Sequence, residues 1–260
     1  MLRRQLLTGL LVTISLIVVL GVVYPVVVWG VGRVAFRYQA DGSLVKVDSK
    51  VVGSALIGQN FADKDGNPLP RYFQPRPSAA GKGYDPTSSG GSNLGPTNPG
   101  LVGFIPGLNT LDLNGNASAD NPFASNGDPY CVPVDDKGNP VTTPSQGQTY
   151  AKNPDGTYVC SPNTVPERVM AYRKLNGLAP GAPVPVDAVT ASGSGLDPDI
   201  SEANALDQAA RVAGARKLSA GVVVALVHRH TTSRAWGVLG EKTVNVLDLN
   251  VALDRLSPPG

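Results

Sequence analysis

Catalysis by a serine hydrolase needs a hydroxyl nucleophile, a histidine base and a carboxylate that orients the base. The residues that offer these groups here are Ser192 and Ser194 as nucleophile, His228 and His230 as base, and Asp197 and Asp199 as carboxylate. The nucleophile elbow Gly-x-Ser-x-Gly is missing, because Ser192 stands two residues before Ser194. A serine hydrolase using Ser194 with His228 or His230 therefore remains an alternative function.

The two histidines do not form a metal-binding pattern. His228 and His230 are two residues apart, which on a helix points them to different sides, and the chain has no Cys-x-x-Cys. Basic side chains near a helix end also stabilise its last carbonyl groups, which is an equally natural role for them. We expect neither a metal site nor a catalytic residue in this chain.

Two glycine-rich segments invite comparison with phosphate-binding loops. Gly90 and Gly95 have the spacing of the two Walker glycines, but Pro96 stands where the loop needs a lysine to neutralise phosphate. The dinucleotide fingerprint fails as well, because the run that begins at Gly193 ends in Pro198 instead of glycine. Tight turns and close backbone packing are the favoured interpretation of both segments.

The first element that positions the rest of the chain is apolar. Residues 5–32 are 28 consecutive uncharged residues rich in Leu, Val and Ile. A bilayer core of about 30 Å needs about 20 such residues in a helix, so this segment predicts a transmembrane anchor. Pro25 lies near its end, where a kink is tolerated. A cleaved signal peptide after Arg3 and Arg4 is the alternative, although its apolar part would span only about 7–15 residues.

Charge alone does not orient the anchor, because basic residues flank it on both sides. The only two cysteines, Cys131 and Cys160, lie in a Gly/Pro/Asn-rich stretch that suits a disulfide in an oxidising compartment, with two unpaired thiols as the alternative. We therefore expect a single-pass membrane protein with its N-terminus in the cytoplasm. Residues 1–33 are then the N-terminal segment and anchor, and residues 34–260 an extracytoplasmic domain.

The charge balance of the domain excludes some partners. Once Arg3 and Arg4 are set aside with the anchor, the basic and acidic residues are equal in number. A neutral domain without a basic run has no electrostatic footprint for nucleic acid or for an anionic membrane face. The lipid bilayer is a partner through the anchor alone, and we expect no nucleic acid.

Coarse patterning predicts one small α+β domain. Short apolar runs predict strands at residues 44–47 and 51–57, and partial alternation predicts one at residues 243–249. An aromatic stretch closed by two prolines predicts a short strand leading into extended structure at residues 71–77. Capping residues and apolar spacing predict helices over residues 164–176, 201–217 and 219–228. Residues 81–100 are too rich in Gly and Pro for either element, and residues 101–163 predict a long irregular insertion.

Short blocks rich in Gly, Ser, Asn and Pro occur along the chain at residues 24–25, 52–59, 72–79, 89–96, 183–187, 189–198, 211–213, 239–241 and 244–250. Taken in this order, the blocks resemble the C subunit of the bacterial Kdp-type potassium-transporting ATPase. The motif or interface residues that the resemblance implies are Gly90, Gly91, Ser92, Asn93, Leu94, Gly95, Ser192, Gly193, Ser194, Gly195, Leu196, Asp197, Asn245 and Asn250. Two departures stand out: residues 101–163 look like an insertion, and Asp199 stands where members often carry histidine.

The resemblance implies a complex of the bacterial cell (inner) membrane in which one subunit conducts potassium, a P-type ATPase subunit hydrolyses ATP, and a non-catalytic C subunit assists both. The family is described as a catalytic chaperone that raises the ATP affinity of the ATPase subunit, so ATP enters through the complex, not as a bound cofactor. A domain outside the cytoplasm does not meet cytosolic ATP. A cap on the outer face of the potassium-conducting subunit is therefore the physically simpler role, with an anchored hydrolase or a cell-surface structural module as alternatives.

Overall fold

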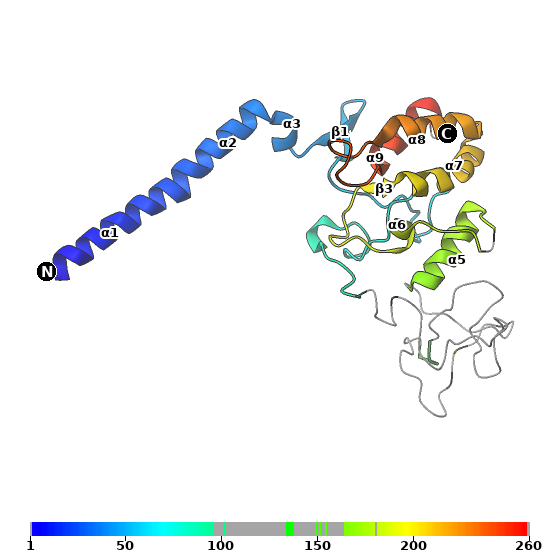
Figure 1. The fold of residues 1–260 in the computed structure, drawn as a ribbon, viewed down its shortest axis with the longest axis horizontal. Helices are drawn as coiled ribbons and strands as arrows, with labels where there is room; N and C mark the ends of the chain where they lie inside the picture. The colour runs from blue at the N-terminus through cyan, green and yellow to red at the C-terminus, as the bar shows by residue number, and fades with distance from the viewer. Residues whose placement is uncertain are drawn as a thin grey trace. The chain divides into compact units, whose positions relative to one another are not determined.

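The computed structural model describes residues 2–95, 101, 134–137, 149, 151, 154, 164–179 and 181–258. The chain forms two compact units, Met1–Leu56 and Ile57–Gly260. The first holds an apolar helix and a hairpin, and the second holds the remaining helices and a small sheet (Figure 1). Cys131 and Cys160 lie outside the described residues, as does most of the predicted insertion, so the disulfide stays a prediction.

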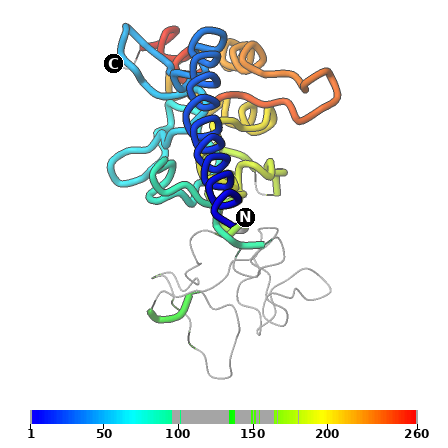
Figure 2. The backbone as a smooth tube through the Cα atoms, turned by 90° about the vertical axis from the view of Figure 1, so that its left-hand side faces the viewer, coloured from blue at the N-terminus to red at the C-terminus, as the bar shows by residue number. Residues whose placement is uncertain are grey.

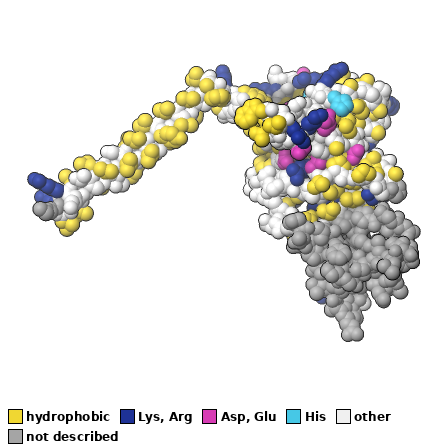
Figure 3. Space-filling model, in the orientation of Figure 1, with side chains coloured by type: hydrophobic (Ala, Val, Ile, Leu, Met, Phe, Trp, Pro, Cys, Tyr) yellow, Lys and Arg dark blue, Asp and Glu magenta, His cyan; other side chains and the backbone are white. Residues whose placement is uncertain are grey.

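The first unit begins with a long apolar helix. α1 (Leu2–Val18) continues through a π-helical turn, η1 (Val19–Val23), into α2 (Tyr24–Ala35). Pro25 cannot donate to the carbonyl of Gly21, and the π-helical turn around Gly21 absorbs this missing bond without ending the helix. Apolar side chains cover its length and arginines lie towards its ends (Figure 3). Its 34 residues are long and apolar enough to cross a membrane, as the sequence predicts.

A β-hairpin completes the first unit. After α3 (Arg37–Ala40), β1 (Leu44–Val47) pairs antiparallel with β2 (Lys50–Ser54). Asp48 and Ser49 join the strands with φ angles of 48° and 65°, the left-handed conformation that tight hairpin turns require. Both predicted strands are confirmed, although the second ends at its fifth residue instead of continuing to residue 57.

Three helices of the second unit begin where capping residues predict them. In each case the side-chain oxygen of the capping residue accepts a hydrogen bond from a first-turn N–H. The pairs are Thr164 with α5 (Val165–Asn176), Ser201 with α7 (Glu202–Arg216) and Ser219 with α8 (Ala220–His230). Gly177 ends α5 with a φ of 65°. α7 and α8 pack side by side (Figure 1) and supply much of the core.

The sheet of the second unit has three short antiparallel strands. β5 (Thr243–Asn245) lies between β3 (Asp199–Ser201) and β4 (Thr231–Thr232). Val244 of the central strand faces Ile200 on one side, and both side chains are fully buried. β3 and β5 each pass directly into a helix, so the sheet fixes where those two helices start.

The predicted strand over residues 243–249 is wrong beyond its third residue. α9 (Val246–Leu256) begins there, and the side chain of Asn245 accepts the N–H of Asp248 as its N-cap. The buried positions of α9 are Val246, Leu247, Leu249, Asn250 and Leu253, a helical spacing. The alternation in the sequence was too short to distinguish a strand from one face of this helix.

The predicted strand over residues 71–77 is also wrong. The structure assigns no strand to this segment, yet Phe73 lies at the centre of the core with no exposed surface. Its core neighbours are Ile200, Ala205, Ala209, Val212, Ala213, Val223, Leu226, Val227, Val244, Val246, Leu249 and Leu253. The predicted loop after it is confirmed over residues 81–95, where the only regular element is the single turn η2 (Pro86–Ser88).

Candidate functional site

Two glycine-rich segments that are far apart in the sequence meet in the second unit. We call residues 89–91 together with residues 192–196 the glycine clasp. The carbonyl of Ser194 accepts hydrogen bonds from the N–H of Gly90 and from the hydroxyl of Ser89, each at 2.9 Å. Hydrogen bonds to one main-chain carbonyl therefore join the two segments.

Glycine is required where the clasp is tightest. Gly195 has a φ of +69°, and a Cβ there would lie 2.7 Å from Ala80 Cβ and 2.8 Å from the carbonyl oxygen of Gly90. A Cβ on Gly91 would lie 3.0 Å from the carbonyl oxygen of Gly193. Both approaches are closer than side chains tolerate, which supports the interpretation of these glycines as packing residues.

The other motif residues of the two segments differ in exposure. Ser192 is buried, and its N–H donates to Pro77 at 3.2 Å. The carbonyl of Leu196 accepts the N–H of Gly58 at 2.9 Å. Ser92 is partly buried, whereas three motif residues lie on the surface, namely Asn93, Leu94 and Gly95.

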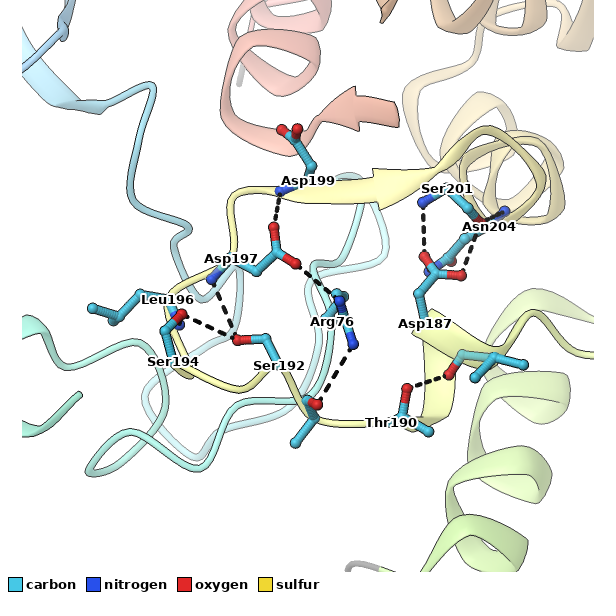
Figure 4. Close-up of polar contacts among 12 residues, drawn as sticks. Arg76, Asp187, Thr190, Ser192, Ser194, Leu196, Asp197, Asp199, Ser201 and Asn204 are labelled. Atoms are coloured by element: carbon cyan, nitrogen blue, oxygen red, sulfur yellow. Dashed lines mark hydrogen bonds and ion pairs between the residues drawn. The ribbon is translucent and has the colours of Figure 1, made fainter. Parts of the chain in front are cut away.

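A carboxylate network continues from the clasp into β3 (Figure 4). Arg76 Nη1 lies 2.9 Å from Asp197 Oδ2, and Arg76 Nη2 donates to the carbonyl of Ala191 at 3.5 Å. The N–H of Asp199 donates to Asp197 Oδ1 at 3.1 Å. Burial raises the pKa of the Asp199 carboxyl, and the neighbouring Asp197 charge adds to the shift, so this acid holds its proton to higher pH than a free one.

Asp187 forms a second polar centre at the start of α7 (Figure 4). It lies in α6 (Val186–Val189) and accepts the N–H and the hydroxyl of Ser201 at 2.7 and 2.8 Å. Asn204 Nδ2 donates to the same carboxylate at 2.9 Å. These bonds fix the N-cap residue of α7 from outside the helix and explain why an aspartate closes the sequence block at residues 183–187.

Asn250 holds the segment that replaces the predicted strand. It is 1% exposed, accepts the N–H of Phe73 at 2.9 Å and donates to the Phe73 carbonyl at 3.0 Å. Gln208 does the same for Gln74, at 2.7 and 3.1 Å. Two buried amides thus satisfy the main chain where a neighbouring strand would otherwise be needed, so Asn250 has a structural role.

The hydrolase residues belong to separate networks. Ser194 Oγ accepts the N–H of Leu196 at 3.1 Å, whereas His228 Nδ1 lies 3.0 Å from a carboxylate oxygen of Glu202. His230 is the last residue of α8. Among the described residues no hydrogen bond links either histidine to Ser192 or Ser194, and no cluster of three metal-ligating side chains forms. The described polar contacts therefore do not assemble the triad that the residue types allow.

A cleft of about 810 Å³ opens between α5 and the segment around residues 74–84. Its charged lining is entirely basic among the described residues, and consists of Arg76, Lys82, Arg168 and Lys174. Tyr84 and Tyr172 supply aromatic wall, and burial raises the pKa of both phenols, so they stay neutral. Sequence reasoning missed this cleft because its lining comes from distant segments without a common motif.

The charge of the cleft selects for negative groups. Burial lowers the pKa of the Arg168 guanidinium, whose Nη1 donates to the carbonyl of Val189 at 2.9 Å, but an arginine stays charged at neutral pH. Arg76 is paired with Asp197, so the positive potential of this concave surface comes mainly from Lys82, Arg168 and Lys174. An anionic group of a ligand or of another protein is the chemistry this cleft fits.

The sequence model of the family described as "KdpC: K+-transporting ATPase, c chain" matches residues 6–118 and 142–255. The match takes in the anchor, the glycine clasp, the Asp187 centre and α9. The chain belongs to the KdpC family. Residues 119–141, between the two matched parts, lie inside the segment predicted as an insertion, whose bounds stay a prediction.

Relatives in the family match almost the whole chain. The potassium-transporting ATPase KdpC subunit of Mycobacterium tuberculosis (strain H37Rv) is 42% identical over 98% of this chain and 100% of its own length. The subunit of the same name from Kineococcus radiotolerans is 41% identical over 99% of this chain and 96% of its length. That of Gemmatimonas aurantiaca is 40% identical over 96% and 92%. The resemblance predicted from the ordered blocks is confirmed.

Proposed function

We propose that this chain is the non-catalytic accessory subunit of an ATP-driven, high-affinity potassium uptake complex, in which it assists assembly and raises the ATP affinity of the P-type ATPase subunit. The observation that carries the proposal is the family match across anchor and second unit together. The polar networks around the clasp and Asp187 are compatible with it, because Asp187, Asp197 and Asn250 all bond to other residues of this chain and hold the fold.

The first test is copurification. The chain is tagged at its C-terminus, expressed with its native operon, solubilised in mild detergent and captured. We expect a potassium-conducting subunit and a P-type ATPase subunit in equal amounts with it. A chain that is captured without either subunit contradicts the proposal and favours a cell-surface structural module.

The proposed arrangement places the second unit outside the cytoplasm and the N-terminus inside. An alkaline phosphatase fused after Gly260 is active only in an oxidising exterior compartment, so we expect full activity from this fusion. A matched fusion after Asp41, just beyond the anchor helix, serves as a control for export by the anchor alone. An inactive fusion at both positions contradicts the exterior placement.

The effect on ATP affinity then passes between subunits, because an exterior unit does not meet cytosolic ATP. Coupling between two sites typically changes affinity about 5- to 150-fold. We expect the apparent KM for ATP of the reconstituted complex to rise at least about fivefold when this chain is left out. Unchanged ATP dependence in the complex without the chain contradicts the chaperone role while leaving its role in assembly intact.

The basic cleft allows a test of the alternative that this chain binds ATP directly. If the isolated chain binds ATP, and Lys174→Glu or Arg168→Glu abolishes that binding, the contact is direct and the exterior placement is wrong. We expect no saturable ATP binding by the isolated chain in equilibrium dialysis. Lys46→Glu, a change in the first unit away from the cleft lining, is the matched control.

Ser194→Ala separates the accessory role from a hydrolase. The hydroxyl of Ser194 accepts one N–H bond in a surface turn, so its loss costs about 1 kcal/mol of stability at most. We expect the variant complex to support potassium uptake at the wild-type rate. An esterase activity that copurifies with the chain and disappears in this variant contradicts the accessory role.

A further inference from the structure

One loop of the second unit is exposed, closed into a hairpin and apolar at its tip. Residues 233–242, between β4 and β5, are all exposed, and Figure 2 shows this orange loop projecting from the rest of the unit. Ala235 and Leu239 exchange two main-chain hydrogen bonds of 2.9 Å, which close the turn. We call residues 234–241 the Trp236 hairpin. The loop is therefore an ordered projection with a defined tip.

The tip carries the most exposed aromatic side chain of the described part of this unit. Trp236 is 91% exposed, Val238 72% and Leu239 53%. The indole makes no aromatic or cation–π contact with any residue that the structure describes. Exposure of an indole together with two aliphatic side chains at one tip is unfavourable in water, and such clusters mark interaction sites.

The backbone at the tip makes this exposure more unusual. Trp236 has a φ of 51° and Gly237 a φ of 81°, two consecutive left-handed residues within the three-residue turn that Ala235 and Leu239 close. Asn, Asp or Gly normally occupies the first of these positions, because a bulky side chain is strained there. The chain thus has a tryptophan at a position where the backbone conformation favours asparagine. Among the described residues, no aromatic or cation–π contact of the indole offsets this backbone strain.

We propose that the Trp236 hairpin is a docking element that inserts its indole into an apolar recess on the exterior surface of another subunit of the potassium-transporting ATPase. The proposal rests on the proposed exterior placement and on assembly with the other subunits. Tryptophan is enriched among the few residues that dominate binding energy at protein interfaces, especially where a polar rim surrounds it. Arg234 and Glu241 supply such a rim, with Arg234 Nη2 3.2 Å from Glu241 Oε2.

The same rim argues against the lipid surface as the occupant. Arg234 and Glu241 neutralise one another at the base of the hairpin, so the tip has no net positive charge to attract anionic headgroups. The Glu241 side chain is 82% exposed, and its carboxylate would be pressed into the headgroup layer if the indole entered the bilayer. A protein recess accepts the indole while leaving the ion pair at the edge in water.

The decisive experiment uses the whole complex and the variant Trp236→Asn. Asparagine suits the left-handed turn, so the hairpin is retained while the indole is lost. We expect at least about a tenfold loss of copurifying subunits under stringent detergent washes, as for truncation of an interface hot spot. Val186→Asn is the matched control, because Val186 is another exposed apolar residue, 72%, on α6. It is expected to leave copurification unchanged.

A photoreactive phenylalanine analogue at position 236 identifies the occupant directly. We expect an ultraviolet-dependent crosslink to one other subunit, and none from position 186. A crosslink to lipid alone, no crosslink, or full copurification of Trp236→Asn overturns the docking proposal. Failure of the wild-type chain to capture any subunit overturns the proposed function instead, so the two failures are distinguishable.

Discussion

The glycine clasp and the Trp236 hairpin use the same backbone conformation in opposite settings. In the clasp, Gly195 has a φ of +69°, and Ala80 and Gly90 leave no room for a Cβ, so the position requires glycine. In the hairpin, Trp236 takes a φ of 51° with its side chain in solvent. Contacts inside the chain explain the glycine at position 195, but they do not explain the tryptophan at position 236. A residue that the fold does not require is the better indicator of an outside partner.

Gly195→Ala should cause the largest loss of stability among these variants. A left-handed alanine costs about 1–2 kcal/mol, and overpacking against Ala80 adds about 1–3, so we expect a loss of roughly 3 kcal/mol in the free energy of unfolding. Urea denaturation of the detergent-solubilised chain measures it. Gly193→Ala is the matched control in the same turn, because nothing lies within 4 Å of its Cβ position. Equal losses for both variants contradict the packing role of the clasp.

Asn250→Ala tests whether buried amides replace the missing strand. The variant leaves the N–H and carbonyl of Phe73 buried without partners, which costs about 2–4 kcal/mol. The double variant with Gln208→Ala, whose amide holds the adjacent Gln74, should be less destabilised than the sum of the two single variants, because both release the same segment. Strict additivity in urea denaturation contradicts a shared role.

Asp199→Asn is expected to have a small, pH-dependent effect. Because the folded-state pKa of Asp199 is raised, its protonated form stabilises the fold below about pH 4, and this contribution disappears as the pH rises through the raised pKa. Asparagine keeps the neutral form, so the variant should gain less than about 1 kcal/mol over the wild type at pH 7 and nothing at pH 3. Thermal unfolding at both values measures it. Asp197→Asn, which removes the partner of Arg76, should lose stability at pH 7.

Trp236→Asn should cause the smallest change in stability among these variants. The side chain is almost fully exposed and its turn position favours asparagine, so we expect the melting temperature of the isolated chain to stay the same or rise slightly. Differential scanning fluorimetry provides the measurement. A loss comparable with that of Gly195→Ala would mean that the indole packs against the chain after all, and would contradict its assignment to an outside partner.

Helix positions in the second unit were predictable because their signals are local. Thr164, Ser201 and Ser219 each cap a helix within one residue of the predicted start, and the first of these helices ends at residue 176, as predicted. A capping hydroxyl bonds to an N–H two or three residues away, so the information lies within one turn of sequence. The long apolar helix was predictable for the same reason, since length and composition suffice.

Residues 71–77 and 243–249 were misjudged because their conformations depend on distant residues. In the first segment Asn250 bonds the main chain of Phe73 in the place of a neighbouring strand, and this contact spans most of the chain. For the second segment, the cap at Asn245 was overlooked in favour of an alternating pattern. The meeting of the two glycine-rich segments and the basic cleft were equally inaccessible, since neither leaves a spacing that can be counted along the chain.

The clasp has a consequence for how the family can vary in length. The main chain at Gly91 lies against that at Gly193, so the long excursion between them leaves and returns at one point. Closing a loop costs only about 0.6 kcal/mol more for each doubling of its length, so residues can be gained or lost within it at little thermodynamic cost. A shortened chain without residues 119–141 should therefore still fold. A reporter domain inserted in place of these residues should be tolerated for the same reason.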